Sequence, residues 1–300
     1  MSTNQQQNSY ERPSFDLTSG FAGCLVETPI GAVALQAALS SGSFGSVYQA
    51  EMTNGEEAFR CYAVKIVSRC SEHGANAFAY EAETLEWLRH AQHRRIVGYH
   101  GNYVPQENPD FGLLFFDLAT FGSLEDLQAE FGIGIPVHRA WDYFQQILDG
   151  LAFIHSEGIF HNDIKPANIL CNRPGSVQIA DFGLASHNHQ DRSQIPMNFG
   201  EGTVSFQPPE IFTDGQFAAD CGDLWAATIT FVTVVTNEVP WEAASDEEEL
   251  FAEFKSGEFP EDYWDKLEEF KEEVLGFLEC DPDNRAIPRL YSDHLEIYLR

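Results

Sequence analysis

The sequence predicts an α+β protein in which a strand-rich N-terminal part is followed by a mostly helical C-terminal part. Short apolar segments between turn residues occupy much of the N-terminal part, with one amphipathic helix among them. Beyond them, apolar residues recur every three or four positions over long segments, as they do in helices. The 300 residues are 43% hydrophobic, which is enough for a sizeable core in one large domain or two modest ones.

The composition is strongly acidic, with a formal net charge of −30 at pH 7. Such a charge repels nucleic acid and anionic membrane surfaces, so we expect neither as a partner, and it attracts basic partners. The six cysteines are scattered without zinc-like spacing or a disulfide framework, which favours a reducing environment. We therefore expect an intracellular, cytoplasmic protein, and the nucleus is also compatible with this composition. The sequence indicates no oligomeric state.

Residues 1–20 are polar and lack periodicity, so we expect a flexible tail before a folded domain at 21–300. The tail has no basic stretch followed by an apolar one, and a secretory signal is therefore not expected. The longest apolar run, 225–235, is too short and too rich in threonine to span a bilayer, and it predicts a buried helix.

A glycine-containing turn joins the first two long predicted strands. An apolar run at 33–39 is followed by S-S-G-S-F-G-S-V at 40–47, and 47–51 are typical of a second strand. Gly42 and Gly45 permit a close approach of the backbone and leave N–H groups exposed, which suits phosphate binding. Glycine turns are common in hairpins, so this turn alone does not indicate a phosphate site.

The next strand and helix carry a lysine and two glutamates. The strand at 62–66 alternates in polarity and directs Lys65 inward. The apolar pattern predicts a helix over 76–89, which carries Glu81 and Glu83. Either glutamate would pair with a nearby lysine or lie on a solvated helix face.

A buried strand at 112–119 leads into a connector and then into helices. Ser123 is a suitable N-cap for the helix that follows, with Asp126 in its first turn. Regular apolar spacing predicts a long helix over 138–157. We interpret this long helix as a scaffold of the core and not as a site.

A polar loop lies between apolar pairs at 159–160 and 169–170. The loop contains His161, Asp163, Lys165 and Asn168. A strand-like run at 177–180 then places Asp181 before Phe-Gly. Polar groups between buried strands cost free energy unless they serve a function. Phosphoryl transfer requires a carboxylate that orients the attacking hydroxyl, oxygen ligands for Mg²⁺ and a cation on the phosphate, and this region supplies all three.

The residues H-N-D-I-K-P-A-N-I-L at 161–170 and D-F-G at 181–183 resemble the catalytic and metal-binding loops of protein kinases. Lys165, two residues after Asp163, is typical of the serine/threonine class. With further motifs, the resemblance extends from residue 33 to residue 285. It implies a two-lobed protein kinase fold. The smaller lobe, an antiparallel sheet plus one helix, would span about 21–118, and the larger, mostly helical lobe about 119–300.

The resemblance implies transfer of the γ-phosphate of ATP to serine or threonine hydroxyls of a protein substrate, with Mg²⁺. Asp163 would orient the hydroxyl and accept its proton, and Lys165 would offset charge on the γ-phosphate. Asn168 and Asp181 would hold Mg²⁺. Lys65 would position the α- and β-phosphates.

Of the two helical glutamates, Glu81 fits best as the partner of Lys65, because later leucines then fall at the family's usual offsets, and Glu83 is the alternative. Phe116 would be the gatekeeper behind the adenine, and the hinge backbone that follows would bind the adenine edge. The implied ATP-binding positions are Leu39, Ser40, Ser41, Gly42, Ser43, Phe44, Gly45, Val47, Ala63, Lys65, Phe116, Asp117, Ala119 and Leu170.

Two positions depart from the patterns G-x-G-x-x-G-x-V and H-R-D of the family. Ser40 replaces the first glycine of the turn. Asn162 replaces the arginine that in many kinases binds a phosphate on the activation segment, so the sequence is of the non-RD type. Asn162 has no cation for that purpose, and we hypothesise activity independent of activation-segment phosphorylation. A catalytically weak, pseudokinase-like scaffold is the alternative, and a small-molecule phosphotransferase is a third interpretation.

The span 184–200 resembles an activation segment. After it, Thr203 stands where serine/threonine kinases place a threonine against the catalytic aspartate. Glu210, in P-P-E, requires a partner if it is buried, and Arg285 stands where the family supplies one. Asp223 resembles the helical aspartate that braces the backbone of the catalytic loop.

Residues 242–273 contain fourteen Asp or Glu against three Lys. We expect most of these charges to form a solvated helix face. The alternative is a surface that attracts basic substrates.

Overall fold

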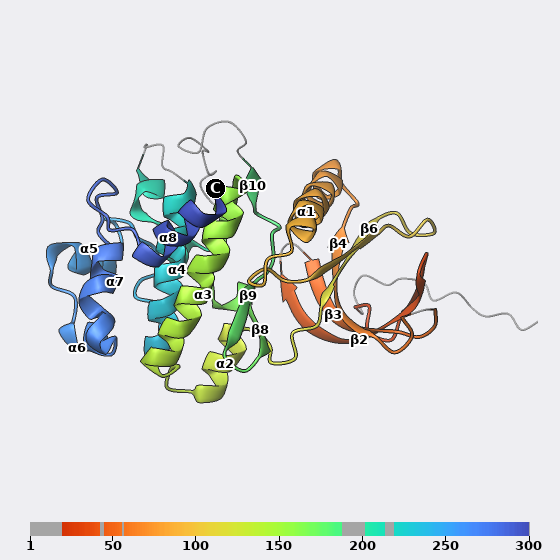
Figure 1. Cartoon of the computed structure of the whole chain (residues 1–300), viewed down its shortest axis with the longest axis horizontal. Helices are drawn as coiled ribbons and strands as arrows, with labels where there is room; N and C mark the ends of the chain where they lie inside the picture. Colours follow the sequence, from red (N-terminus) through yellow and green to blue (C-terminus); the bar gives the residue numbers. More distant parts are fainter. Residues whose placement is uncertain (1–19, 43–44, 56, 188–201, 214–218, 300) are drawn as a thin grey trace, which may run out of the picture.

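The computed structural model describes residues 20–42, 45–55, 57–187, 202–213 and 219–299 of the chain. A curled antiparallel sheet with one helix beside it forms the N-terminal part, and helices form most of the C-terminal part (Figure 1). The predicted α+β, two-lobed fold is therefore confirmed. Residues 1–19 of the predicted tail lie outside the described residues, as do Ser43 and Phe44 of the predicted phosphate-binding turn.

Six strands form the N-terminal sheet in the order β1-β2-β3-β4-β6-β5, and all neighbours are antiparallel. Their bounds are β1 Leu25–Thr28, β2 Gly31–Gly42, β3 Gly45–Met52, β4 Cys61–Ser68, β5 Tyr99–Tyr103 and β6 Phe111–Asp117. Successive side chains of β4 point to opposite faces. Tyr62, Val64 and Ile66 therefore enter a small core of the sheet, whereas Ala63 faces the main core and shares its face with Lys65.

Helix α1 (Glu72–Ala91) packs against this second face of the sheet. It begins after Ser71, whose hydroxyl accepts a hydrogen bond from the backbone N–H of Gly74 at 3.0 Å. The helix is longer than the predicted 76–89, because this cap starts it before the apolar pattern does.

The C-terminal part consists of helices and short strands. The helices are α2 Leu124–Phe131, α3 Val137–Ser156, α4 Ala219–Thr236, α5 Glu249–Ser256, α6 Glu261–Asp265, α7 Lys271–Phe277 and α8 Arg289–Tyr298. Single turns of 3₁₀ helix are η1 Pro166–Asn168, η2 Val204–Phe206, η3 Pro209–Phe212 and η4 Glu268–Phe270. Ser123 caps α2 through a reciprocal pair of hydrogen bonds with Asp126, which confirms the predicted start of that helix.

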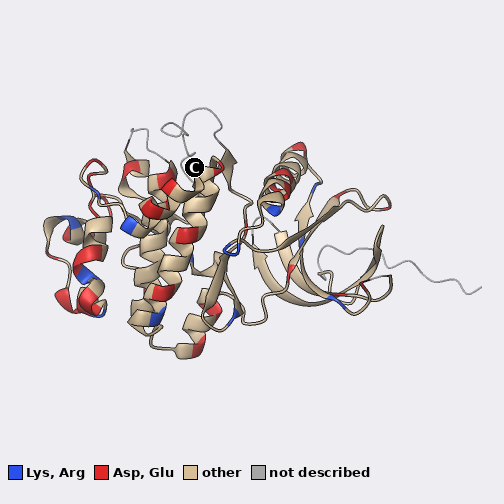
Figure 2. Ribbon diagram, in the orientation of Figure 1, with Lys and Arg blue, Asp and Glu red and all other residues tan. Residues whose placement is uncertain are grey.

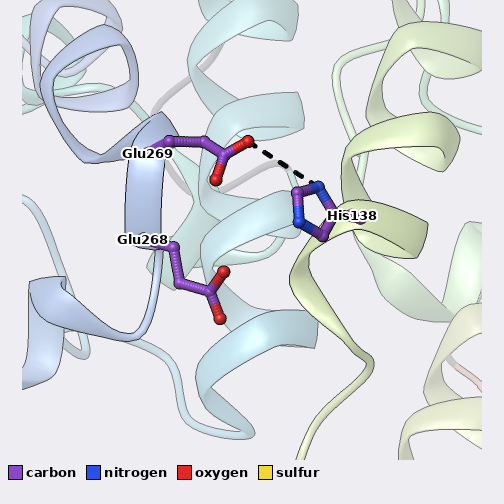
Figure 3. Close-up of side chains that lie close together, drawn as sticks. All are labelled: His138, Glu268 and Glu269. Carbon is purple, nitrogen blue, oxygen red and sulfur yellow. Dashed lines mark ion pairs between the residues drawn. The ribbon is translucent and has the colours of Figure 1, made fainter.

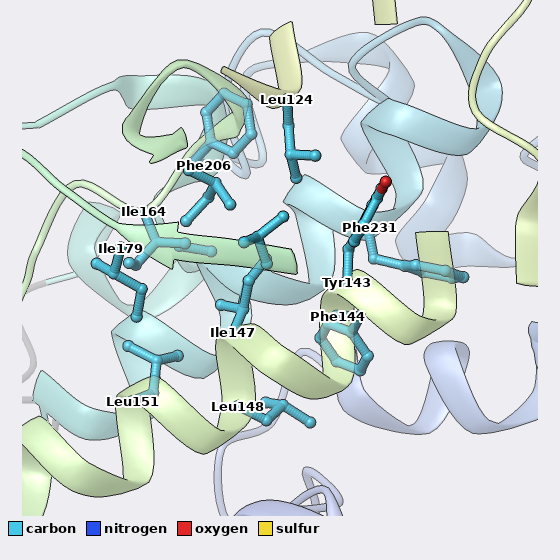
Figure 4. Packing of buried hydrophobic residues seen from close by; sticks show 14 of the residues in the cluster. Leu124, Tyr143, Phe144, Ile147, Leu148, Leu151, Ile164, Ile179, Phe206 and Phe231 are labelled. Carbon is cyan, nitrogen blue, oxygen red and sulfur yellow. The ribbon is translucent and has the colours of Figure 1, made fainter. Parts of the chain in front are cut away.

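The main core is built around α3 and α4. Phe144, Ile147 and Leu151 of α3 are buried beside Ile164 and Phe231 from the polar loop and from α4 (Figure 4). Helix α4 is almost entirely buried, as the apolar run 225–235 predicts. Its threonines fit such surroundings because several hydroxyls donate to backbone carbonyls one turn earlier in the helix.

Four short strands frame the polar loop. They are β7 Ile159–Phe160, β8 Ile169–Arg173, β9 Ser176–Ile179 and β10 Ser186–His187. Strand β8 pairs with β9 and strand β7 pairs with β10, both antiparallel. The loop 161–168 is therefore fixed at both ends, and D-F-G lies between β9 and β10.

The last helix joins the two parts of the chain through one buried carboxylate. Asp149 of α3 accepts hydrogen bonds from Tyr298 of α8 (2.6 Å) and from Arg94 (3.0 Å) in the segment that follows α1. His294 Nδ1 lies 3.0 Å from the same carboxylate, and His93 contacts both Asp149 and Tyr298. These contacts connect α8 and α3 with the segment between α1 and β5.

Within the described parts of the chain, every helix is too short or too polar to cross a lipid bilayer.

Candidate active site

A cavity of about 450 Å³ lies between the N-terminal sheet and the loop that follows β7. Nine of the predicted ATP-binding residues line it: Leu39, Ser40, Val47, Ala63, Lys65, Phe116, Asp117, Ala119 and Leu170. Asn168 and Asp181 also line it. Most of the predicted nucleotide residues and both predicted metal ligands are thus brought to one cavity from segments that lie far apart in the sequence.

Sequence reasoning missed part of the cavity wall. The additional lining residues are Ala38, Val97, Gly122, Ser123, Glu125, Asp126, Ala167 and Ala180. The sequence identifies Ser123 and Asp126 only as the start of a helix. In the structure, this start of α2 forms one wall of the cavity. The other additional lining residues show no distinctive pattern in the local sequence that would predict their place in the cavity wall.

Of the described residues of the glycine turn at 40–47, Ser40 on β2 and Val47 on β3 line the cavity. Ser41, Gly42 and Gly45 are not among the residues that line the cavity. Gly45 has φ +137°, and a Cβ there would lie 2.4 Å from the carbonyl oxygen of Ile66 in β4. Glycine at this position is therefore required by strand packing. A Cβ at Gly42 would meet no atom within 4 Å.

Lys65 lies between two carboxylates. Its Nζ is 2.6 Å from Glu81 Oε1 on α1 and 2.8 Å from Asp181 Oδ1 after β9. Both the lysine and Glu81 are buried, whereas Glu83 is exposed on the same helix. Of the two candidates, Glu81 is thus the partner in contact with the lysine.

Burial alone would lower the pKa of Lys65, but Asp181 and Glu81 hold this pKa above its ordinary value. Burial also opposes ionisation of Asp181, yet Lys65 keeps the pKa of that carboxyl below its usual range. The site therefore holds a fixed cation beside an ionised carboxylate.

The Asp163 carboxylate is surrounded by donors. Its Oδ1 accepts from the backbone N–H (3.0 Å) and the hydroxyl (2.8 Å) of Thr203, and its Oδ2 accepts from Asn168 Nδ2 (3.0 Å). Lys165 Nζ lies 2.7 Å from Asp163 Oδ2 and 2.7 Å from the Thr203 hydroxyl. The arrangement keeps the carboxylate in one orientation and places a cation beside it.

The backbone of the polar loop is held from the core. Asp223 of α4 accepts hydrogen bonds from the backbone N–H groups of His161 (2.7 Å) and Asn162 (2.8 Å). Asp223 also contacts His155 Nε2 at 2.8 Å, and His161 Nε2 contacts the carbonyl of Ala180 at 2.9 Å. These bonds link the loop, D-F-G and two core helices.

Asn162 has a positive φ of +65°, which asparagine tolerates better than most residues. Its Nδ2 donates to the carbonyl of Leu184 and to the hydroxyl of Ser186, each at 2.9 Å. Its Oδ1 is buried and has no hydrogen-bond partner among the described residues. Where the family pattern has an arginine, this chain thus uses a neutral amide to bind the segment after D-F-G.

Asp117, which the resemblance places in the hinge, turns its side chain toward His100, whose Nε2 lies 2.7 Å away. This hydrogen bond lowers the pKa of Asp117. The backbone N–H of Asp117 donates to the carbonyl of Gly98 at 2.8 Å. That N–H group is therefore engaged in a backbone hydrogen bond within the protein.

Glu210 of η3 and Arg285 form a buried ion pair with two contacts, at 2.6 and 2.7 Å. The Arg285 guanidinium also lies 4.7 Å from the centre of the Trp225 ring. The pair joins the stretch after Thr203 to the segment before α8, as the sequence pattern predicts.

One further group of possible metal ligands lies away from this cavity. His138, Glu268 and Glu269 bring their ligand atoms within 4.8 Å of one another (Figure 3). His138 Nδ1 is 4.0 Å from Glu269 Oε1, and all three side chains are exposed. Exposed acidic groups are common without an ion, and we assign no function to this trio.

Comparisons with known proteins agree with this geometry. A family model described as protein kinase domain matches residues 34–290. Serine/threonine-protein kinase STK11 of Gallus gallus is 31% identical over 251 residues, which are 82% of this chain and 55% of that protein. Mitogen-activated protein kinase kinase kinase YODA of Arabidopsis thaliana is 33% identical over 264 residues, which are 85% of this chain and 28% of that protein.

Serine/threonine-protein kinase chk-1 of Caenorhabditis briggsae is 28% identical over 231 residues, which are 77% of this chain and 46% of that protein. The chain spans about half the length of STK11 and chk-1 and a smaller share of YODA. The family model covers most of the chain, including every residue of the cavity wall, and the chain therefore belongs to the protein kinase family.

Proposed function

We propose that the chain, through a kinase domain at 21–300, transfers the γ-phosphate of ATP to serine or threonine hydroxyls of protein substrates. The observation that carries this proposal is a cavity lined by Lys65, Asp181 and Asn168. Lys65 is paired there with Glu81 and Asp181, and Asn168 binds the Asp163 carboxylate next to the cavity. The names of the related proteins, which include serine/threonine-protein kinases, support the same class of substrate.

In the proposed reaction, Asp163 orients a substrate hydroxyl and accepts its proton as the oxygen bonds to the γ-phosphorus. The bond from that phosphorus to the β–γ bridging oxygen breaks, and ADP leaves with the bridging oxygen. Lys165, held beside Asp163 and Thr203, offsets charge on the transferred group. Lys65 positions the α- and β-phosphates, and Glu81 holds the lysine.

The donor set fits Mg²⁺. The Asn168 amide nitrogen donates to Asp163, which leaves the amide oxygen as the group for a cation, and Asp181 supplies an ionised carboxylate on the same cavity. When bound there, Mg²⁺ would neutralise charge on the phosphates.

The test compares the wild type with Asp163→Asn for phosphate transfer from Mg²⁺-ATP to a mixture of protein substrates. We expect transfer by the wild type and a loss of roughly a hundredfold or more in the variant, because the variant lacks the base. Equal signals would favour the scaffold alternative.

We further propose that activity does not require phosphorylation of the activation segment. Asn162 has no positive charge with which to bind a phosphate, and its amide already binds Leu184 and Ser186. The purified protein should keep its activity after treatment with a phosphatase. A loss of activity on that treatment would refute this proposal.

A preference for basic substrates is a third proposal. The acidic side chains of 242–273 lie along the segment that contains α5, α6, η4 and the start of α7, at the end of the molecule farthest from the sheet, and nearly all are exposed (Figure 2). They would attract Lys and Arg in a substrate. A peptide array without enrichment of basic residues would rule this out.

A further inference from the structure

The segment after D-F-G is held to the C-terminal lobe by two sets of contacts. Asn162 binds Leu184 and Ser186 through its amide nitrogen. Strand β10 pairs with β7, with Ser186 opposite Phe160 and His187 opposite Ile159. The backbone of residues 184–187 therefore has a fixed position relative to the loop that carries Asp163.

His187 reaches from this segment to α1 in the other lobe. Its Nε2 lies 2.8 Å from the hydroxyl of Thr84, and its ring lies 4.9 Å from the ring of Tyr80, centre to centre. One residue thus makes two contacts with α1.

The direction of the hydrogen bond from His187 follows from the hydroxyl of Thr84. A threonine hydroxyl has one hydrogen, and Thr84 donates it to the carbonyl of Tyr80 at 2.9 Å. The same hydroxyl therefore accepts from His187, whose Nε2 carries the proton. An amide N–H placed at that point would make the same bond.

The two α1 residues that His187 contacts, Tyr80 and Thr84, lie before and after Glu81 in the sequence. Residues 80 and 84 are one helical turn apart, and Glu81 shares its helix face with Thr84. Both Glu81 and Thr84 are buried. A shift of α1 away from His187 would carry Glu81 away from Lys65, because a helix moves as a rigid element.

We propose that His187 is a positioning residue that binds Thr84 and Tyr80 and thereby holds Glu81 against Lys65. The bridge links the segment after D-F-G to α1 through a side chain. Its effect on phosphate transfer rests on the proposed function, whereas its effect on α1 and on nucleotide binding does not.

The test uses three variants of the full chain. His187→Phe keeps an aromatic ring against Tyr80 and removes the N–H, Thr84→Val keeps the side-chain shape and removes the hydroxyl, and His187→Gln restores a donor. We expect the first two to weaken Mg²⁺-ATP binding and to increase amide hydrogen exchange in α1, each by roughly threefold to tenfold. The Gln variant should resemble the wild type.

Two comparisons separate positioning from general destabilisation. The double variant His187→Phe/Thr84→Val should lose no more ATP affinity than either single variant, because both substitutions remove the same hydrogen bond. The variants should also raise KM for ATP while leaving KM for a protein substrate unchanged. His90→Phe, on the exposed surface of α1, is the matched control and should behave as the wild type.

Unchanged ATP affinity and unchanged exchange in His187→Phe would overturn the proposal. Failure of His187→Gln to restore either property would also overturn it. Binding and exchange need no phosphate transfer, so a wild type without kinase activity whose α1 still loosens in His187→Phe would refute the proposed function and support the bridge.

Discussion

The Asp223 carboxylate accepts backbone hydrogen bonds from both His161 and Asn162, at 2.7 and 2.8 Å. Asp223 lies on α4 and is 1% exposed, so the loop that carries Asp163 is fixed from the most buried helix of the molecule. The orientation of the loop is therefore a property of the core. It does not depend on what occupies the cavity.

We expect Asp223→Asn to lower both stability and activity. An asparagine nitrogen would face a backbone N–H and leave it unpaired, at a cost of roughly 2–3 kcal/mol in the free energy of unfolding. Urea unfolding measures this loss, and a phosphate-transfer assay should show at least a tenfold decrease. Asp262→Asn, on the exposed surface of α6, is the control. A variant as stable as the wild type would contradict the role of Asp223.

Glu81→Gln should reduce kcat/KM for ATP by roughly tenfold, because a charge-assisted bond to Lys65 becomes a neutral one. Glu83→Gln, on the same helix, should have no effect, since Glu83 is exposed. Steady-state kinetics with ATP as the varied substrate distinguishes the two. Equal losses in both variants would show that the contact seen between Lys65 and Glu81 does not control ATP use.

Asp149→Asn should destabilise the protein in a pH-dependent way. Burial would raise the pKa of Asp149, but the His93 imidazole 3.7 Å away and hydrogen bonds from Tyr298 and Arg94 lower it well below its ordinary value. A carboxyl with a depressed pKa contributes stability above about pH 4, and this contribution is lost as the pH falls toward the folded pKa.

The difference in unfolding free energy between wild type and Asp149→Asn should thus be roughly 2–4 kcal/mol at pH 7 and should shrink below about pH 4. Chemical unfolding at a series of pH values measures it. Asp142→Asn, exposed on the same helix, should show no such trend. A difference that stays constant down to pH 3 would be inconsistent with the depressed pKa.

The Glu210–Arg285 pair should show strong coupling in a double-mutant cycle. Removal of either partner leaves a buried, unpaired charge and should cost roughly 3–5 kcal/mol, whereas removal of both should cost less than the sum. Glu210→Gln, Arg285→Gln and the double variant, compared by urea unfolding, test this. If the losses in unfolding free energy of the two single variants simply add up in the double variant, the two side chains contribute to stability independently of each other.

Much of the site can be predicted because its residues stand in recognisable patterns of the local sequence. Lys65 stands on an alternating strand, and the loop around Asp163 stands between apolar pairs, so both are visible as patterns. The Glu210–Arg285 pair is predictable only through the family resemblance, since 75 positions separate the two residues.

Other features have no local signal. His187 and Thr84 are 103 positions apart, and a threonine in a helix and a histidine in a polar segment both look like ordinary polar residues. At Gly45, the family resemblance implies a phosphate-binding turn, and the structure shows in addition that packing against β4 leaves no room for a Cβ. The roles of such residues depend on tertiary contacts, which cannot be predicted from the periodicity of the local sequence.

The contacts of Tyr298 have a consequence for how the chain acquires its structure during translation. Tyr298 meets His93 across 205 positions and Asp149 across 149. During synthesis, the Asp149 carboxylate and the arginines beside it must therefore wait for α8 to leave the ribosome. Closure of this network therefore follows the synthesis of α8, and contacts at such sequence separation slow folding.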